Sequence, residues 1–257
     1  MSTIMFGNSR LCDRDQMRQV PTPEATRTYT PLPFSFVDEK VMGSLDRHGL
    51  RPRSPVYALS KKSQVIHMVY EIDKQLPENV SEDQASDHTQ VFVCKTSHDR
   101  STSCWGMGGT DCTVCDNGWF FGGHQMRRVH RGSVDLTLGD AIDEVVIKLI
   151  PEFKKNEHRI LAYKGTEISD PEVHDVVIRA LDRKVISATQ LPRVIGQWRH
   201  SPFEEYSDPT VWSLANAFTH VLTRGKSTGQ IPRKNIAMNE MLDELCVQKF
   251  DELSESA

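Results

Sequence analysis

The feature that most limits the fold of this chain is a change of hydrophobic period near residue 135. Before that point, runs such as 55–60 and 64–72 are rich in β-branched and aromatic residues and are separated by turn-forming residues, which is typical of β-strands. Beyond it, apolar residues recur every three or four positions, as in 139–150 and 169–184, which predicts helices. The sequence therefore predicts an α+β fold, with an antiparallel sheet in the N-terminal half followed by a helical C-terminal half.

Polar residues, prolines and glycines mark where the helices should begin and end. Ser35 is a candidate N-cap for a short helix that stops at Gly49. Asp170 and Asp208 each precede a proline, so we expect both to cap helices, the second of which should stop at Gly225. A capping side chain satisfies free backbone N–H groups, and glycine tolerates the backbone conformation that ends a helix.

Composition divides the chain into three parts. Residues 1–34 should form an extended N-terminal arm, because segment 20–34 contains four prolines and four threonines. Residues 35–235 should form a single α+β domain, and residues 236–257 an acidic C-terminal helix or tail. The arm either wraps a partner subunit, which makes a homo-oligomer attractive, or lies on its own domain.

The charge is unevenly distributed. The net charge is −4, but residues 240–257 carry six acids against one lysine, a balance of −5, which leaves −4 − (−5) = +1 for residues 1–239. A nearly neutral body with an acidic end can bind nucleic acid through a local basic patch. The end would then compete for that patch or recruit partners, or it is a solvated amphipathic helix.

Nothing in the sequence indicates export or insertion into a membrane. No run approaches the ~18 apolar residues of a membrane span, and the N-terminus has no long apolar run behind a basic start. We therefore expect an intracellular protein without a membrane partner. In that setting the six cysteines should be reduced thiols rather than a disulfide framework.

A CxxC pair raises the question of zinc. Cys112 and Cys115 form half of a zinc knuckle, which Cys104, His124 or His130 could complete. A second pair at standard spacing is missing, and on a strand positions 112 and 115 would point to opposite faces. Buried thiols are therefore favoured, without metal or cofactor. Because no GxSxG, HExxH or P-loop sequence is present either, the sequence predicts a protein that is not an enzyme.

The strongest chemical signal is an aromatic run followed by basic residues, between positions 119 and 131. Aromatic faces stack on unpaired bases and arginines neutralise phosphates, so this pairing suits single-stranded nucleic acid. Alternatively the aromatics are core residues and the arginines pair with surface acids. The candidate nucleic-acid-binding residues are Trp119, Phe121, Arg127, Arg128, His130 and Arg131, extended by Arg51, Arg53, Lys61, Lys62, Arg199, Lys226 and Lys234.

Five short motifs, in order, resemble those of the phage/plasmid-like family of unknown function. They fall at Val20–Pro23, Ser97–Ser101, Val114–Gly118, Arg127–His130 and Asn216–Thr219. The resemblance covers roughly residues 20 to 225. Arg100 stands where this family usually has glycine, which puts that turn in doubt.

The length, the proline-rich arm and the acidic end are also similar to those of the single-stranded-DNA-binding RNA polymerase cofactors of certain lytic podophages. This narrower resemblance implies a non-OB single-strand binder that works with a phage RNA polymerase in early or middle transcription, in the cytoplasm of a bacterial host cell. Phage strand-annealing proteins are the neighbouring possibility.

The leading expectation is thus a non-catalytic, sequence-tolerant single-stranded-DNA-binding protein. A single-strand annealing or recombination protein, a zinc-dependent nucleic-acid enzyme and a pure protein-interaction module remain the alternatives.

Overall fold

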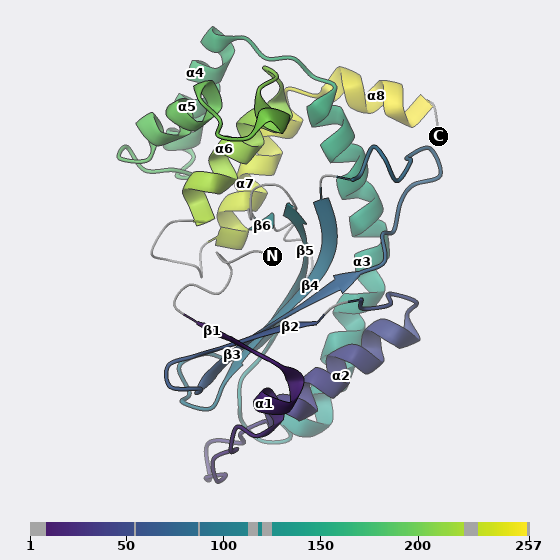
Figure 1. Cartoon of the computed structure of the whole chain (residues 1–257), viewed down its shortest axis with the longest axis vertical. Helices are drawn as coiled ribbons and strands as arrows, with labels where there is room; N and C mark the ends of the chain where they lie inside the picture. The colour runs from purple at the N-terminus through teal and green to yellow at the C-terminus, as the bar shows by residue number, and fades with distance from the viewer. Residues whose placement is uncertain are drawn as a thin grey trace.

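The fold is the predicted α+β arrangement. The computed structural model in Figure 1 describes residues 9–53, 55–86, 88–112, 118–119, 125–223 and 231–255. The described strands all lie before residue 129, with two helices between the first strand and the second, and helices follow them. Figure 1 shows the curved sheet below and a group of helices above it, with one long helix running alongside both.

Seven strands form one antiparallel sheet in the described part of the chain. They are β1 (Arg10–Cys12), β2 (Val56–Ser60), β3 (Val65–Ile72), β4 (His88–Ser97), β5 (Cys104–Cys112), β6 (Gly118–Trp119) and β7 (Gln125–Arg128). Neighbours in space follow chain order from β1 to β5, and β6 and β7 both pair with the outer edge of β5. The strands predicted at 55–60 and 64–72 are confirmed as β2 and β3, joined by the expected tight turn.

The helices flank and follow the sheet. They are α1 (Arg14–Arg18), α2 (Phe34–Arg47), α3 (Val134–Lys164), α4 (Asp170–Asp182), α5 (Leu191–Arg199), α6 (Val211–Thr223), α7 (Ile231–Asp243) and α8 (Val247–Glu255), with a 3₁₀ turn at Glu204–Tyr206. Among the described helices, none is long and apolar enough to cross a membrane.

The helix stop predicted at Gly49 is confirmed. Gly49 has φ +73°, and the N–H of Leu50 donates to the carbonyl of Leu45 at 2.9 Å, so α2 ends in the glycine motif expected. The cap predicted at Asp170 is wrong by one residue, because Ser169 caps α4 in a capping box with Glu172.

The caps predicted at Ser35 and Asp208 are also wrong, because neither residue lies at the cap position of its helix. Helix α2 already begins at Phe34, so Ser35 lies inside it. Helix α6 begins at Val211, so Asp208 precedes its cap position. In its place the hydroxyl of Thr210 accepts from the N–H of Ser213 at 3.3 Å. Gly225, the expected stop of α6, lies outside the described residues.

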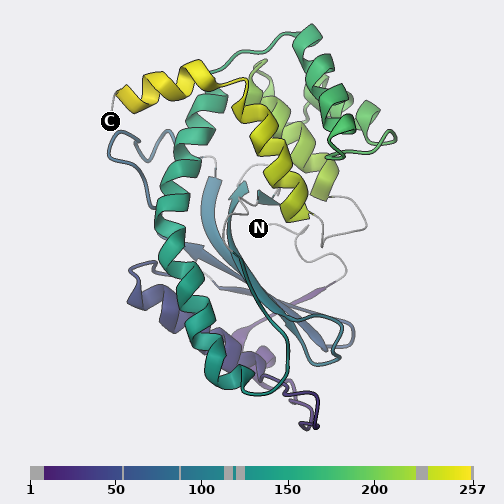
Figure 2. The same ribbon diagram turned by 180° about the vertical axis from the view of Figure 1, so that it is seen from behind.

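Helices α2 and α3 cover one face of the sheet, which we call the helix face. Side chains alternate between the two faces of a strand, and the even-numbered residues of β3 and β4 point to the helix face, where Met68, Tyr70 and Phe92 are fully buried with α2 and α3. Figures 1 and 2 show α3 behind the sheet from one side and in front of it from the other.

Gly108 in β5 allows α3 to lie close against the sheet. A Cβ added at Gly108 would lie 2.5 Å from Leu149 Cδ2 of α3. We expect Gly108→Ala to lower the free energy of unfolding by about 1–3 kcal/mol through overpacking, measured by urea denaturation. Gly196→Ala on α5 is the matched control, because nothing lies within 4 Å of its added Cβ and alanine favours a helix. Equal effects of the two changes would refute this account.

Strand β1 and helix α1 lie within residues 1–34, so the predicted arm is not extended throughout. The arm and the acidic end both lie on the rest of the chain. The Tyr29 hydroxyl donates to the carbonyl of His98 at 3.0 Å, and the Thr30 N–H donates to the carbonyl of His130 at 3.0 Å. At the other end, the boundary predicted at residue 236 falls inside α7, whose Met238 and Met241 are buried in the helical core.

Two acids of this C-terminal part are held by arginines of other helices. Arg159 Nε donates to Asp243 Oδ1 at 2.8 Å. Arg183 Nη2 donates to Glu244 Oε1 at 2.9 Å, and Arg179 also binds Glu244. This pairing places both acids in the helical half rather than against the sheet.

Candidate nucleic-acid interface

The face of the sheet opposite the helix face, the second face, carries an unusual row of side chains. Four residues are direct cross-strand partners in succession: His67 pairs with Lys95, Lys95 with Trp105, and Trp105 with Arg127. We call these four the cross-strand row. Adjacent strands lie about 4.8 Å apart, so the row extends over roughly 14 Å. It places an indole between two cations.

The row is partly accessible and positively charged. Arg127 is exposed, whereas Lys95, Trp105 and His67 are half-buried. Arg127 Nε donates to Ser103 Oγ at 2.9 Å. Burial, and then the neighbouring charge of Lys61, lower the pKa of Lys95. Burial, and then the charge of Lys95, lower the pKa of His67 to about 4. A bound anion would relieve this crowding of positive charge.

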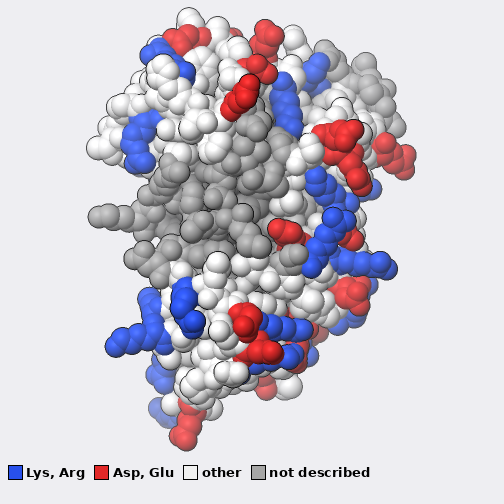
Figure 3. Space-filling model, in the orientation of Figure 1, with Lys and Arg blue, Asp and Glu red and all other residues white. Residues whose placement is uncertain are grey.

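Two strained turns place further basic residues beside the row. Lys61, Lys62 and Ser63 have φ of 50°, 55° and 67°, and Arg100 has φ of 62°, conformations that cost non-glycine residues of order 1–3 kcal/mol each. The two turns are neighbours, since His98 N donates to the carbonyl of Gln64 at 2.7 Å. Figure 3 shows lysines and arginines gathered at the lower left, where Figure 1 places these turns.

The basic residues of these turns also have local partners. Lys61 Nζ lies 3.7 Å from Asp99 Oδ2, with the lysine side chain 59% and the aspartate side chain 28% exposed. The Arg100 guanidinium lies over the Tyr29 ring, 4.5 Å from its centroid. Exposed pairs of this kind are weak, so a phosphate can compete for both cations. Arg100 thus adopts the left-handed turn conformation that glycine would accept more easily.

Four predicted site residues lie far from this row. Arg53 bonds to Asp73 and, with Arg51, precedes β2 at the opposite end of the β2–β3 hairpin from the lysine turn. Arg199 donates to Asp170 in the helical half. Lys234 is a half-buried residue of α7. The structure does not bring these four residues together with Lys61 and Lys62.

The segment around Arg127 is divided by the sheet. Arg128 follows Arg127 in β7 and therefore points to the helix face, while Arg131 is exposed beyond the strand. His130 is only 4% exposed, its Nε2 lies 3.0 Å from Thr96 Oγ1, and burial lowers its pKa. The expectation that the side chain of His130 faces nucleic acid does not fit this buried position.

The predicted aromatic positions are only partly described. Trp119 lies in β6 and pairs with Thr110, but its side chain is not among those described. Phe121 and Lys226 lie outside the described residues. Among the described side chains, the aromatic residue on the second face beside cations is Trp105, which is half-buried against the apolar cluster of that face.

Sequence reasoning missed Lys95, Trp105 and His67 as site residues. The signal was present in the short turn between β4 and β5. Counting outward from this turn pairs Lys95 with Trp105, and alternation then assigns both to one face.

The candidate zinc ligands are only partly described. Cys104 is fully buried, and Cys94 lies in the same buried cluster on the helix face. Within the described ranges, no three His, Cys, Asp or Glu side chains are grouped to hold a metal ion. Cys115 and His124 lie outside those ranges, and the side chain of Cys112 is not described.

Comparison with known proteins identifies a family. No curated protein and no solved structure matches the chain. Residues 39–243 match the model of a domain of unknown function, DUF932. This span runs from α2 to the end of α7 and includes the cross-strand row. Because the match covers most of the sequence, the chain belongs to the DUF932 family.

Proposed function

We propose that this protein binds single-stranded DNA, without catalysis and with little sequence preference, through the cross-strand row and the neighbouring lysine turn. The observation that carries the proposal is the position of Trp105 between Lys95 and Arg127 on the second face of the sheet. Stacking on an aromatic side chain contributes about 1–3 kcal/mol per base, and flanking cations meet the adjacent phosphates.

The chemistry of the row accounts for the expected selectivity. An indole stacks on any of the four bases because each has a π-face, so sequence matters little. In a duplex the bases are already paired and stacked on one another, so they cannot stack on Trp105. Lys95 and Arg127 each lie about 4.8 Å from Trp105 across the sheet, one on each side of a stacked base.

The biological setting of this activity is a further part of the proposal. The sequence resemblance supports a phage protein that acts with a phage RNA polymerase in early or middle transcription, as a homo-oligomer. A pull-down of that polymerase by the intact protein tests this role. Recovery of the polymerase that is unaffected by loss of DNA binding would instead favour a protein-interaction module.

Trp105→Ala is expected to weaken binding to oligo-dT by about 5–150-fold, which corresponds to the loss of one stacking contact. Fluorescence anisotropy at low salt measures the affinity. Lys95→Ala and Arg127→Ala should each make the slope of log K against log[salt] shallower by about 0.7.

Two controls separate binding from folding. Trp105→Phe keeps an aromatic face and should retain most of the affinity, whereas Arg199→Ala changes an arginine already paired with Asp170 and should have no effect. Equal affinity for duplex and single strand, or no binding at low salt, contradicts the proposal.

A further inference from the structure

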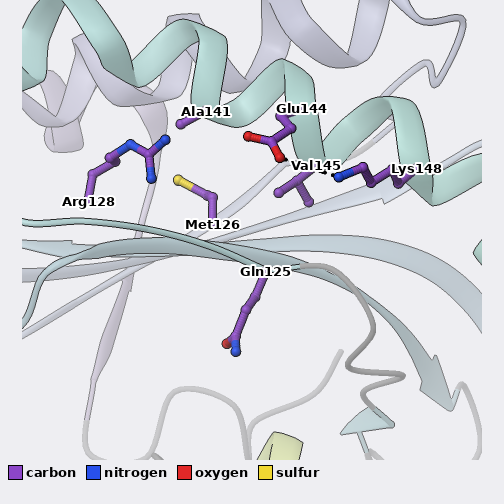
Figure 4. A pocket seen from close by; sticks show the side chains of 7 residues that line it. All are labelled: Gln125, Met126, Arg128, Ala141, Glu144, Val145 and Lys148. Carbon is purple, nitrogen blue, oxygen red and sulfur yellow. Dashed lines mark hydrogen bonds and ion pairs between the residues drawn. The ribbon is translucent and has the colours of Figure 1, made fainter.

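A groove lies on the other side of the edge strand β7, between that strand and α3. Its volume is about 250 Å³, and it is lined by Gln125, Met126, Arg128, Glu144, Val145 and Lys148, together with Ala141. Figure 4 shows Met126 and Arg128 pointing from β7 toward α3, while Gln125 points the opposite way. The groove therefore has cations from two elements, Arg128 from the strand and Lys148 from the helix.

The groove and the end of the cross-strand row lie on opposite sides of the same strand, β7. Arg127 is the last residue of the row, and Arg128 follows it on the opposite side of β7. Among the described strands, β7 pairs only with β5. No described strand therefore continues the sheet beyond β7.

We propose that this groove is a second nucleotide subsite, so that a bound single strand passes from Arg127 around the edge of β7 to Arg128 and Lys148. The inference rests on the proposed function and extends it from one stacked base to a longer strand. Arg128 and Lys148 bind phosphates, and the nearly buried side chains of Met126 and Val145 form the floor of the groove between them.

Arginine on an edge strand has another explanation, since charged residues there prevent sheets from pairing edge to edge. That explanation requires only exposed charge. It does not account for the direction of Arg128, which is half-buried and points into a groove beside a second cation, Lys148. Binding of an anion between strand and helix accounts for both features.

The negative charge of one groove residue, Glu144, would repel a bound phosphate. Glu144 Oε1 accepts from Lys148 Nζ at 3.3 Å, and the two side chains are 66% and 45% exposed. Such an exposed pair contributes little stability, so a phosphate can displace Glu144 from Lys148. Removing the charge of Glu144 should strengthen binding of strands that reach the groove.

The test compares oligo-dT of about five nucleotides with oligo-dT of about fifteen, a range that brackets common single-strand sites. For the unaltered protein, the longer strand should bind more tightly. Arg128→Ala combined with Lys148→Ala should reduce the long-to-short affinity ratio by about 5–30-fold, because two phosphate contacts are lost. Glu144→Gln should increase this ratio.

Lys154→Ala is the matched control, since Lys154 is an exposed lysine of the same helix that does not line the groove. An unchanged ratio in the double variant, or a ratio that falls equally in Lys154→Ala, overturns the subsite while leaving the cross-strand row intact. Failure of Trp105→Ala to weaken binding of the short strand overturns the proposed function itself. The two failures are therefore distinguishable.

Discussion

Asp38→Ala should lower the free energy of unfolding by about 2–6 kcal/mol, because two buried tyrosine hydroxyls lose their acceptor at about 1–3 kcal/mol each. The Asp38 carboxylate has no exposure to solvent. It accepts from Arg14 Nε at 2.8 Å and from the hydroxyls of Tyr57 and Tyr70 at 2.9 Å each. Removing it leaves two buried hydroxyls and one guanidinium without their acceptor.

The contacts of Asp38 should stabilise several elements of the fold at once. Asp38 lies on α2, Arg14 on α1, and the tyrosines on β2 and β3, so one carboxylate joins four elements. Urea denaturation of full-length protein measures the loss. Asp46→Ala changes an exposed acid of the same helix and should alter stability by less than about 0.5 kcal/mol. A loss at Asp38 no larger than at Asp46 would show that the cluster is unimportant.

Acidification from about pH 6.5 to pH 4 should remove about 3 kcal/mol of stability through His67 alone. Burial, and then the charge of Lys95, lower the pKa of His67 from 6.5 to about 4 in the folded state. The unfolded chain therefore binds a proton at a higher pH than the folded one does. Stability from this group is fully present above pH 6.5 and is lost as the pH falls toward 4, by about 1.4 kcal/mol per pH unit.

His98 and His130 act in the same direction, because burial lowers the pKa of each. Unfolding free energies measured in urea across this pH range give the slope. His67→Gln removes the titrating group. The loss of unfolding free energy between pH 6.5 and pH 4 should therefore be smaller in this variant by about 3 kcal/mol. A profile of unchanged steepness in this variant would mean that His67 is not the group responsible.

Much of the fold followed from local pattern. The β-branched and aromatic residues in 64–72 predicted β3, and the turn residues from Lys61 to Ser63 placed the hairpin correctly. The helical period after residue 135 predicted α3, but not that this helix continues through Pro151 to Lys164. Its extension depends on long-range burial, since Phe153 packs against the sheet and Tyr163 against the helical half.

The candidate site was harder to predict because its members come from different strands. Nearness in the sequence grouped Arg127, Arg128 and His130. The pleat of β7 sends the two arginines to opposite faces, and the loop after it buries His130. Lys95 and Trp105 joined Arg127 only once three strands were in register.

The sequence by itself determined the α+β class, with the sheet before the helical half, and the presence of aromatic and basic residues in the region after residue 94. These properties depend on neighbours within a few positions, where backbone geometry and hydrophobic period act directly. Only the tertiary structure decided which of those residues share a face. Register between strands is set by the packing of the whole helix face, and a shift of one residue would move every side chain of a strand to the other side.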